Sequence, residues 1–306
     1  MADNGTGTDM VKVRIPATSA NIGSGFDALG VAVALYNYVY MRESDRLAIR
    51  SHDGADIPLD KENLVWKTAK HLYDVCGKPL KGLELEQLSN IPFARGLGSS
   101  SACIIGGLLG ANEMLGKPLT QDALIDMAAV LEGHPDNTTP ALTGGLVTAV
   151  LDNGKVHYVK QEIHNDLRFA VIIPDFELKT SLARSVLPQE IPHTDARFNL
   201  ARSALMAVSL YSGKYENLRI GADDRLHQPY RLELIPGGGQ VMELCLKNGA
   251  YAAYVSGAGS SLMAIVDDAV LDFEQKTRDS LDDMGLQGWR LHILSIDNKG
   301  AILMRG

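Results

Sequence analysis

The apolar residues of the chain follow two different spacings, which together predict a protein of mixed α and β structure. Alternating or Val- and Tyr-rich segments predict strands at 11–15, 31–41, 83–88, 146–151, 156–159, 169–173, 252–256, 262–266, 289–296 and 301–304. Helical spacing predicts helices at 64–76, 102–115, 120–131, 197–211, 240–247 and 271–284. The segments 16–27, 96–101 and 257–261 are rich in glycine, and we predict that they form a first, a second and a third glycine loop.

Residues at the segment ends refine this pattern. Asn63 and Thr120 each precede a predicted helix, where their side chains can accept hydrogen bonds from the first turn. The sequence Asp-Asn-Gly-Lys at 152–155 predicts a hairpin. We predict two domains, 10–165 and 166–306, with their joint within 161–167, and we predict a loose polar tail at 1–9.

Charge and cysteine content exclude several classes of partner. The net charge is −8 and no block of Lys and Arg occurs, which argues against nucleic-acid and membrane-surface binding. The most apolar stretch, 102–111, is about half as long as a membrane span, so no membrane association is predicted. The three cysteines have no Cys-x-x-Cys spacing, which argues against a disulfide framework or a zinc site and predicts a reducing, cytoplasmic location.

The second glycine loop has the composition of a phosphate-binding site. Gly96 and Gly98 allow close backbone approach, and the loop runs directly into an apolar helix. The unpaired N–H groups and positive dipole end of that helix suit a polyphosphate, and the serine hydroxyls could bind phosphate or Mg²⁺. The same residues also fit a serine-capped core helix after a flexible turn.

Two other nucleotide-binding patterns fit less well. The segment 23–28 satisfies the Gly-x-Gly-x-x-Ala dinucleotide pattern, but strand-like alternation follows it instead of an amphipathic helix. A Walker loop is absent, because the Gly-Lys pairs at 77–78 and 116–117 both precede proline.

Three motifs resemble those of the GHMP family of small-molecule kinases, and they occur in the family's order. The second glycine loop with its flanks, 92–102, resembles the phosphate-binding loop; 16–27 and 255–261 resemble the first and third motifs. The resemblance spans about 11–304. It implies an α+β, two-domain GHMP kinase fold, with an N-terminal ribosomal-protein-S5-like domain that binds ATP, a C-terminal ferredoxin-like domain, and the site between them.

Three shorter segments of the chain resemble segments that are typical of the homoserine kinases within that family. They are the Glu-Gly-His-Pro-Asp-Asn segment at 132–137, Lys-Thr at 179–180 with Arg184, and His-Gln-Pro-Tyr-Arg at 227–231. This implies ATP-dependent phosphorylation of L-homoserine to O-phospho-L-homoserine in threonine biosynthesis. Departures at 138–139 and 258–260 remove no polar group that the chemistry needs. Another GHMP kinase of the mevalonate-pathway type and a non-catalytic nucleotide sensor of the same fold remain alternatives.

The resemblance also implies where ATP and Mg²⁺ bind. The nucleotide residues are Asn63, beside the adenine, and the loop residues Pro92, Phe93, Ala94, Arg95, Gly96, Leu97, Gly98, Ser99, Ser100, Ser101 and Ala102. Ser100 and Glu132 are predicted to ligate Mg²⁺. Asn63 fits equally well as an N-cap, and an isolated Glu at a helix end is usually only solvated.

For homoserine, the resemblance implies a matching set of polar groups. Asn21 and Asp27 are suited to the ammonium, Arg184 and Arg231 to the carboxylate, and His134 and Asn137 to the hydroxyl; Thr180 and Gly257 complete the predicted substrate site. The predicted catalytic residues are Asn137, Asp136, Arg184 and His134. Asp136 is either a general base or not needed as one, because the hydroxyl proton can leave late to a phosphate oxygen. A homodimer is ordinary for the family.

Overall fold

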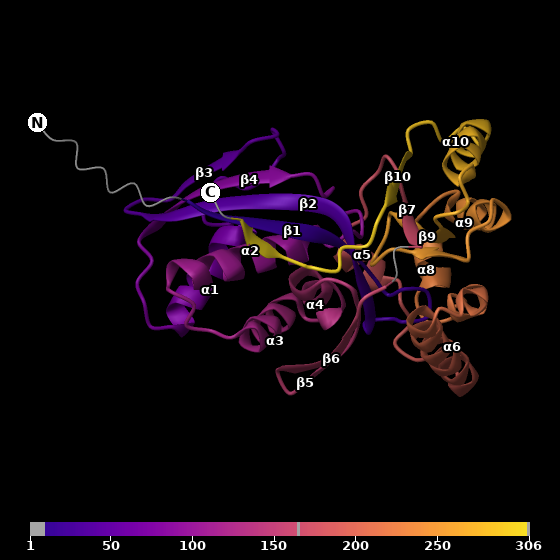
Figure 1. Ribbon diagram of the computed structural model, residues 1–306, viewed down its shortest axis with the longest axis horizontal. Coiled ribbons are helices and arrows are strands. Elements are labelled where there is room, and N and C mark those ends of the chain that lie inside the picture. The colour runs from indigo at the N-terminus through magenta and orange to yellow at the C-terminus, as the bar shows by residue number, and fades with distance from the viewer. Residues whose placement is uncertain (1–9, 164–165, 305–306) are drawn as a thin grey trace, which may run out of the picture.

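The structure is a computed structural model that describes residues 10–163 and 166–304. The predicted tail at 1–9 lies outside the described residues, as do two residues of the predicted joint at 161–167. Figure 1 shows the early strands and helices gathered at one end of the molecule and most later elements at the other.

The first sheet contains the strands of the N-terminal half. Its strands are β1 (Val11–Ala20), β2 (Leu29–Ser44), β3 (Ala48–Ser51), β4 (Gly82–Ser89), β5 (Leu146–Asp152), β6 (Lys155–Gln161) and β11 (Ile302–Met304). Their order is β11-β1-β2-β4-β3, with β5 paired to β2 and β6 to β5. Only the β3–β4 pair is parallel among these described strands.

Helices cover one face of this sheet (Figure 1). They are α1 (Leu64–Val75), α2 (Ser99–Met114), α3 (Gln121–Glu132) and α4 (Pro135–Thr143). α2 packs against α1, α3, α4 and β1, so neighbours surround it on nearly every side. Its sequence is apolar around most of its circumference for that reason, and residues such as Ile105 and Leu108 are buried.

The second sheet belongs to the C-terminal half. It consists of β7 (Leu167–Ile173), β8 (Ala252–Val255), β9 (Leu262–Asp267) and β10 (Arg290–Leu294), all antiparallel, in the order β10-β7-β9-β8. This is the fourth-first-third-second order of a ferredoxin-like sheet. The helices of this half are α5 (Thr180–Ser185), α6 (His193–Ser212), the short 3₁₀ helix η1 (Tyr215–Asn217), α7 (Leu218–Gly221), α8 (Gln228–Leu232), α9 (Gly238–Lys247) and α10 (Phe273–Asp283).

Most predicted elements are confirmed, and two differences have clear physical causes. β1 continues through Pro16 to Ala20, where we predicted a loop, because a register shift between Pro16 and Ala17 accommodates the missing N–H group. α4 was not predicted. It has Pro135 at its first position, where proline is favourable, and Pro140 inside it.

The last described strand returns to the first sheet. β11 pairs with β1, and the backbone of Ala301 donates to the carbonyl of Ala141 at the end of α4. The predicted domain ranges 10–165 and 166–306 stay a prediction, and this strand lies in the second range but completes the first sheet. Among the described helices, none is long and apolar enough to cross a membrane.

Candidate active site

The three glycine loops meet in one place. The side chain of Asn21 in the first loop donates to the carbonyl of Gly257 in the third, at 2.8 Å. Ser256, beside the third loop, donates its hydroxyl to the carbonyl of Gly96 in the second loop, at 2.7 Å. Segments that are far apart in the sequence therefore surround a shared pocket.

This pocket contains most of the residues that we predicted for the site. Its lining consists of Asn21, Asp27, Pro92, Ala94, Arg95, Gly96, Leu97, Gly98, Ser99, Ser100, Glu132, His134, Asp136, Asn137, Thr180, Arg184, Arg231, Gly257 and Ala258.

One end of the pocket is the N-terminus of α2. Gly98 precedes the helix in the left-handed conformation, with φ 70°, and within the described part of the chain no side chain caps the helix start. A β-carbon on Gly98 would lie 2.0 Å from Oγ1 of Thr18, so glycine is required both for the backbone angle and for the close approach. The first-turn N–H groups are left for an anion.

Two of the three serines at the start of α2 interact with Glu132 instead of capping their own helix. Ser100 Oγ donates to Glu132 at 3.0 Å, and Ser101 Oγ donates to the same carboxylate at 3.1 Å. Ser99 Oγ is buried without a hydrogen-bond partner among the described residues. Hydroxyl and carboxylate oxygens are the hard ligands that Mg²⁺ prefers, so Ser100 and Glu132 fit a Mg²⁺ ion beside the helix N-terminus.

The other end of the pocket carries opposite charges. Arg184 on α5 forms an ion pair with Asp27 of the first glycine loop, at 3.0 Å, and both side chains are partly exposed. Arg231 on α8 is 1% exposed, yet it lines the pocket. Burial, followed by the neighbouring charge of Arg184, lowers the pKa of Arg231 to about 10, so it still carries a positive charge at neutral pH.

Between these two ends lies the start of α4. His134 Nδ1 and Asp136 Oδ1 form a hydrogen bond of 2.5 Å, while Oδ2 of Asp136 is buried without a partner among the described residues. Burial alone would lower the pKa of His134, but the hydrogen bond to Asp136 and its charge raise it above the ordinary value. Asn137 Oδ1 accepts a hydrogen bond of 2.7 Å from Thr18 Oγ1, which fixes the orientation of the amide.

A second set of side chains has the spacing of metal ligands. Ligand atoms of Asp27, His134 and Asp136 lie within 4.8 Å of one another. His134 and Asp136 are hydrogen-bonded to each other, and Asp27 is paired with Arg184. These existing partners make this set a less suitable metal site than Ser100 and Glu132.

The structure does not bring every predicted residue into the pocket. Asn63 is buried as the N-cap of α1, where its Oδ1 accepts from Val65 and its Nδ2 donates to Gln87. All of its hydrogen-bonding capacity is used locally, so its role beside the adenine stays a prediction. Phe93, Ser101 and Ala102 lie outside the pocket lining; Phe93 packs against the core, and the other two are buried in α2.

Thr18 and Ala258 are site residues that the sequence pattern did not predict. Thr18 orients Asn137, and Ala258 lines the pocket beside Gly257. Both lie within the motifs that we recognised, so only their individual contacts were missing from the prediction.

Comparisons with known proteins identify the family of the chain. The family model "GHMP kinases N terminal domain" matches residues 63–145, and the model "GHMP kinases C terminal" matches residues 206–277. The first range holds the second glycine loop with α2 and α4, and the second holds α8 and the third glycine loop.

Individual relatives match over nearly their whole length. The homoserine kinase of Clostridium beijerinckii is 45% identical over 298 residues, which cover 97% of this chain and 99% of the relative. The homoserine kinase of Caldicellulosiruptor saccharolyticus is 46% identical, with coverage of 95% and 96%. A crystal structure of homoserine kinase from Cytophaga hutchinsonii superposes with a TM-score of 0.87 at 27% identity, over 99% of this chain and all of that one. The predicted two-domain fold is confirmed by these matches.

Proposed function

The chain belongs to the GHMP kinase family, and from that premise we propose that it transfers a phosphoryl group from ATP to the side-chain hydroxyl of L-homoserine. The product is O-phospho-L-homoserine, an intermediate on the way to threonine. The observation that carries this proposal is the pocket itself. It joins the free N-terminus of a buried helix to a set of charges that complements an amino-acid zwitterion.

The end of the pocket that carries Asp27, Arg184 and Arg231 is called the acceptor end below, and it fits the two charged groups of homoserine. Arg184 and Arg231 present guanidinium groups to a carboxylate, which they can bind through charge-assisted hydrogen bonds. Asp27 provides the negative charge for the ammonium. With both charged groups held there, the side chain of homoserine extends toward Asn137 and the second glycine loop.

Asn137 is placed to hold the reacting hydroxyl. Because Oδ1 accepts from Thr18, the amide presents its Nδ2 donor elsewhere, and we assign that donor to the hydroxyl oxygen of homoserine. Asp136 lies beside it, with one oxygen held by His134 and the other without a partner among the described residues. We propose that these groups orient the hydroxyl and that its proton passes late to a phosphate oxygen, so that no general base is required.

We propose that Mg²⁺ is the metal of the site and that Ser100 and Glu132 hold it. When bound there, the ion would neutralise phosphate charge beside the first turn of α2. The backbone of the chain binds the phosphates: the N–H groups of α2 bind phosphate oxygens, and Gly96 and Gly98 let the backbone come close to them.

Location and assembly belong to the same proposal. The described cysteines Cys76, Cys103 and Cys245 are free thiols, as expected in a reducing cytoplasm, where we place the protein. We propose a homodimer from the family resemblance, and sedimentation equilibrium of the purified chain would test it.

The activity is tested by coupling ADP release to a panel of alcohols. We expect MgATP-dependent ADP release with L-homoserine, well above the rates with L-serine, mevalonate and galactose. Serine is the sharpest comparison, because it keeps both charged groups and shortens the side chain by one methylene. If folded protein phosphorylates mevalonate or galactose but not homoserine, the substrate assignment is wrong. If it binds ATP and phosphorylates none of them, the homoserine assignment is wrong and a nucleotide sensor becomes the favoured alternative.

A further inference from the structure

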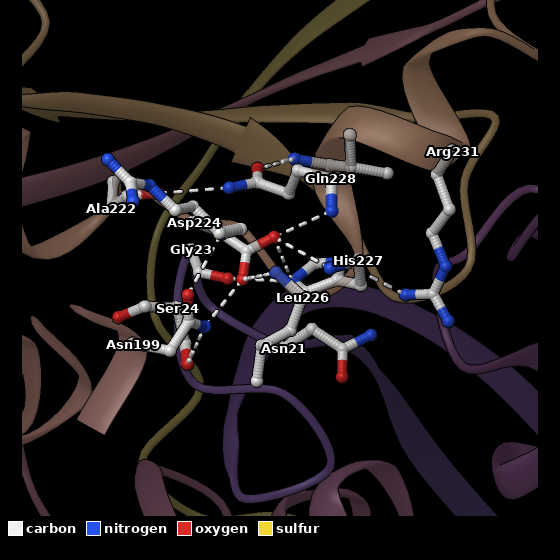
Figure 2. Close-up of polar contacts among 12 residues, drawn as sticks. Asn21, Gly23, Ser24, Asn199, Ala222, Asp224, Leu226, His227, Gln228 and Arg231 are labelled. Carbon is white, nitrogen blue, oxygen red and sulfur yellow. Dashed lines mark hydrogen bonds and ion pairs between the residues drawn. The ribbon is translucent and has the colours of Figure 1, made fainter. Parts of the chain in front are cut away.

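A buried polar network contacts Arg231, which lines the acceptor end of the pocket (Figure 2). At its centre, the Asp224 carboxylate accepts hydrogen bonds from Asn199 Nδ2 at 2.6 Å and from the backbone N–H groups of Leu226, His227 and Gln228. Asp224 thereby fixes the start of α8. His227, the residue that precedes α8, is 0% exposed. A side chain so completely enclosed is held in one orientation.

The partners of His227 determine which ring nitrogen carries the proton. Nε2 lies 2.7 Å from the carbonyl oxygen of Gly23 in the first glycine loop. A carbonyl oxygen only accepts, so Nε2 is the protonated nitrogen. Nδ1 then has a free lone pair, and Nη1 of Arg231 lies 3.2 Å from it and can only donate. The neutral Nε2–H tautomer is the form of His227 that satisfies both contacts.

The other contacts of Arg231 leave one nitrogen for the pocket. Nη1 also donates to the carbonyl of Gly257 at 2.9 Å, and Nε lies 3.4 Å from the carbonyl of Ala183. Among the described residues, Nη2 has no hydrogen-bond partner. The ring of Phe26 lies on the other side, 5.1 Å from the His227 ring and 5.2 Å from the Arg231 guanidinium carbon, in a stacked and a cation–π contact.

We propose that His227 is a positioning residue for substrate specificity: its Nδ1 lone pair fixes the guanidinium of Arg231 so that Nη2 meets the carboxylate of the acceptor. This inference rests on the proposed function, in which Arg231 binds the carboxylate of homoserine. His227 does not touch the substrate. Its effect is to pre-orient an arginine, which otherwise loses considerable side-chain entropy when it binds a ligand.

Two substitutions separate the two hydrogen bonds of His227. In His227→Asn, the amide oxygen takes the place of Nδ1 and can still accept from Arg231, while the bond to Gly23 is lost. In His227→Gln, the amide nitrogen takes the place of Nε2 and can still donate to Gly23, while the acceptor for Arg231 is lost. Both variants keep a polar side chain in the buried site, so the difference between them reports on Arg231.

The comparison uses homoserine and 3-amino-1-propanol, which keeps the ammonium and hydroxyl but lacks the carboxylate. Hydrogen bonds to charged groups contribute enough that His227→Gln should raise KM for homoserine about tenfold or more. Its KM for 3-amino-1-propanol and for ATP should stay within about threefold of wild type. His227→Asn should keep most of the homoserine preference. His157→Gln, at an exposed position of β6, is the control and should change nothing.

Other outcomes would overturn the inference. If His227→Gln and His227→Asn raise KM equally, or weaken both acceptors equally, His227 has only a structural role. If wild-type protein shows no homoserine-dependent ADP release while another alcohol is phosphorylated, the proposed function itself has failed, which is a different result from failure of the variants.

A measurement on the wild-type protein keeps the test valid should either variant fail to fold. In protein labelled with ¹⁵N-histidine, the NMR shifts of His227 should show Nε2 protonated and Nδ1 unprotonated at neutral pH. The Nδ1 resonance should move when homoserine is added and stay in place with 3-amino-1-propanol. A protonated Nδ1, or equal shifts with both compounds, would contradict the assignment.

Discussion

The carboxylate of Glu132 is held by two serine hydroxyls of a different helix, and this makes it more than a solvated residue at a helix end. If it ligates Mg²⁺, Glu132→Gln removes a negative ligand while keeping size and hydrogen bonding. Turnover should fall by at least ~10²-fold, because electrostatic stabilisation of the transferring phosphate is a leading contribution. The measurement is kcat at millimolar Mg²⁺, with KM for homoserine expected to change little. Near-wild-type turnover would show that the carboxylate has only a structural role.

The variant Asp136→Asn tests whether abstraction of the hydroxyl proton by Asp136 limits the reaction. General base catalysis typically contributes ~10²–10⁴-fold, and we expect Asp136→Asn to cost less than about 10²-fold in kcat. The reason is that, in the mechanism that we propose, Asn137 holds the hydroxyl, and one oxygen of Asp136 is already hydrogen-bonded to His134. Single-turnover kinetics would isolate the chemical step. A larger loss, with unchanged homoserine affinity and intact fold, would identify Asp136 as the base.

The sequence predicted which residues lie in the site better than it predicted which residues they contact. The motifs identified Asp27 and Arg184 as oppositely charged site residues, but the ion pair between them joins the first glycine loop to α5, 157 positions apart. Asn63 shows the reverse case. The capping pattern predicted its role at α1 correctly, because that contact is local, whereas its assignment to the adenine depended on a position in space.

At the level of elements, the start of α2 requires glycine at position 98 for two reasons: the backbone angle is left-handed, and Thr18 lies too close for a side chain. Gly98→Ala would place a side chain at φ 70° and only 2.0 Å from Thr18 Oγ1, which in turn orients Asn137. We expect a rise in KM for ATP and a loss of stability of about 1–2 kcal/mol. Gly154→Ala in the β5–β6 turn is the matched control, because its φ is +78° and nothing lies within 4 Å of the added β-carbon. It should lose less stability in urea unfolding than Gly98→Ala, because only its backbone angle is strained, and its kinetics should be unchanged. Equal kinetic effects would contradict the role of this loop.

The same contrast between local and distant contacts explains which elements were predicted. The helix at 120–131 and the hairpin at 146–159 depend on a Thr120 cap and an Asn-Gly turn, both visible in a few residues. α4 was missed because its polar, proline-containing sequence lacks helical spacing. It is nevertheless buried along its length, packed against β1, β2 and α2, and this tertiary environment stabilises it.

At the scale of the whole molecule, His227 connects α8 to the first glycine loop, and its titration should affect folding. Burial, and secondarily Arg231, lower its pKa, whereas Asp224 and Asp27 act in the opposite direction. Because the folded-state pKa lies below the unfolded value of 6.5, the unfolded state binds the proton first. The contribution of neutral His227 to the free energy of unfolding is therefore fully present above about pH 6.5. This contribution is lost as the pH falls from there toward the folded-state pKa.

The variant His227→Asn removes this titration. The free energy of unfolding, measured with urea between about pH 7.5 and 5, should fall more steeply for wild type than for the variant. His134 and His292 titrate in both proteins, so their contributions cancel in the difference. Parallel pH profiles would mean that His227 has the same proton affinity in the folded and unfolded chain.

The return of β11 to the first sheet also has a consequence for how the protein is made. Lys12 pairs with Met304, so one edge of β1 finds its partner only after the roughly 290 residues between them have been synthesised. While the ribosome is still adding the C-terminal half, that edge exposes unpaired N–H and C=O groups, a form prone to pairing with other chains. Emergence of β11 from the ribosome allows this edge to close. The same strand that completes the sheet thus ends the period in which the nascent protein is most exposed to aggregation.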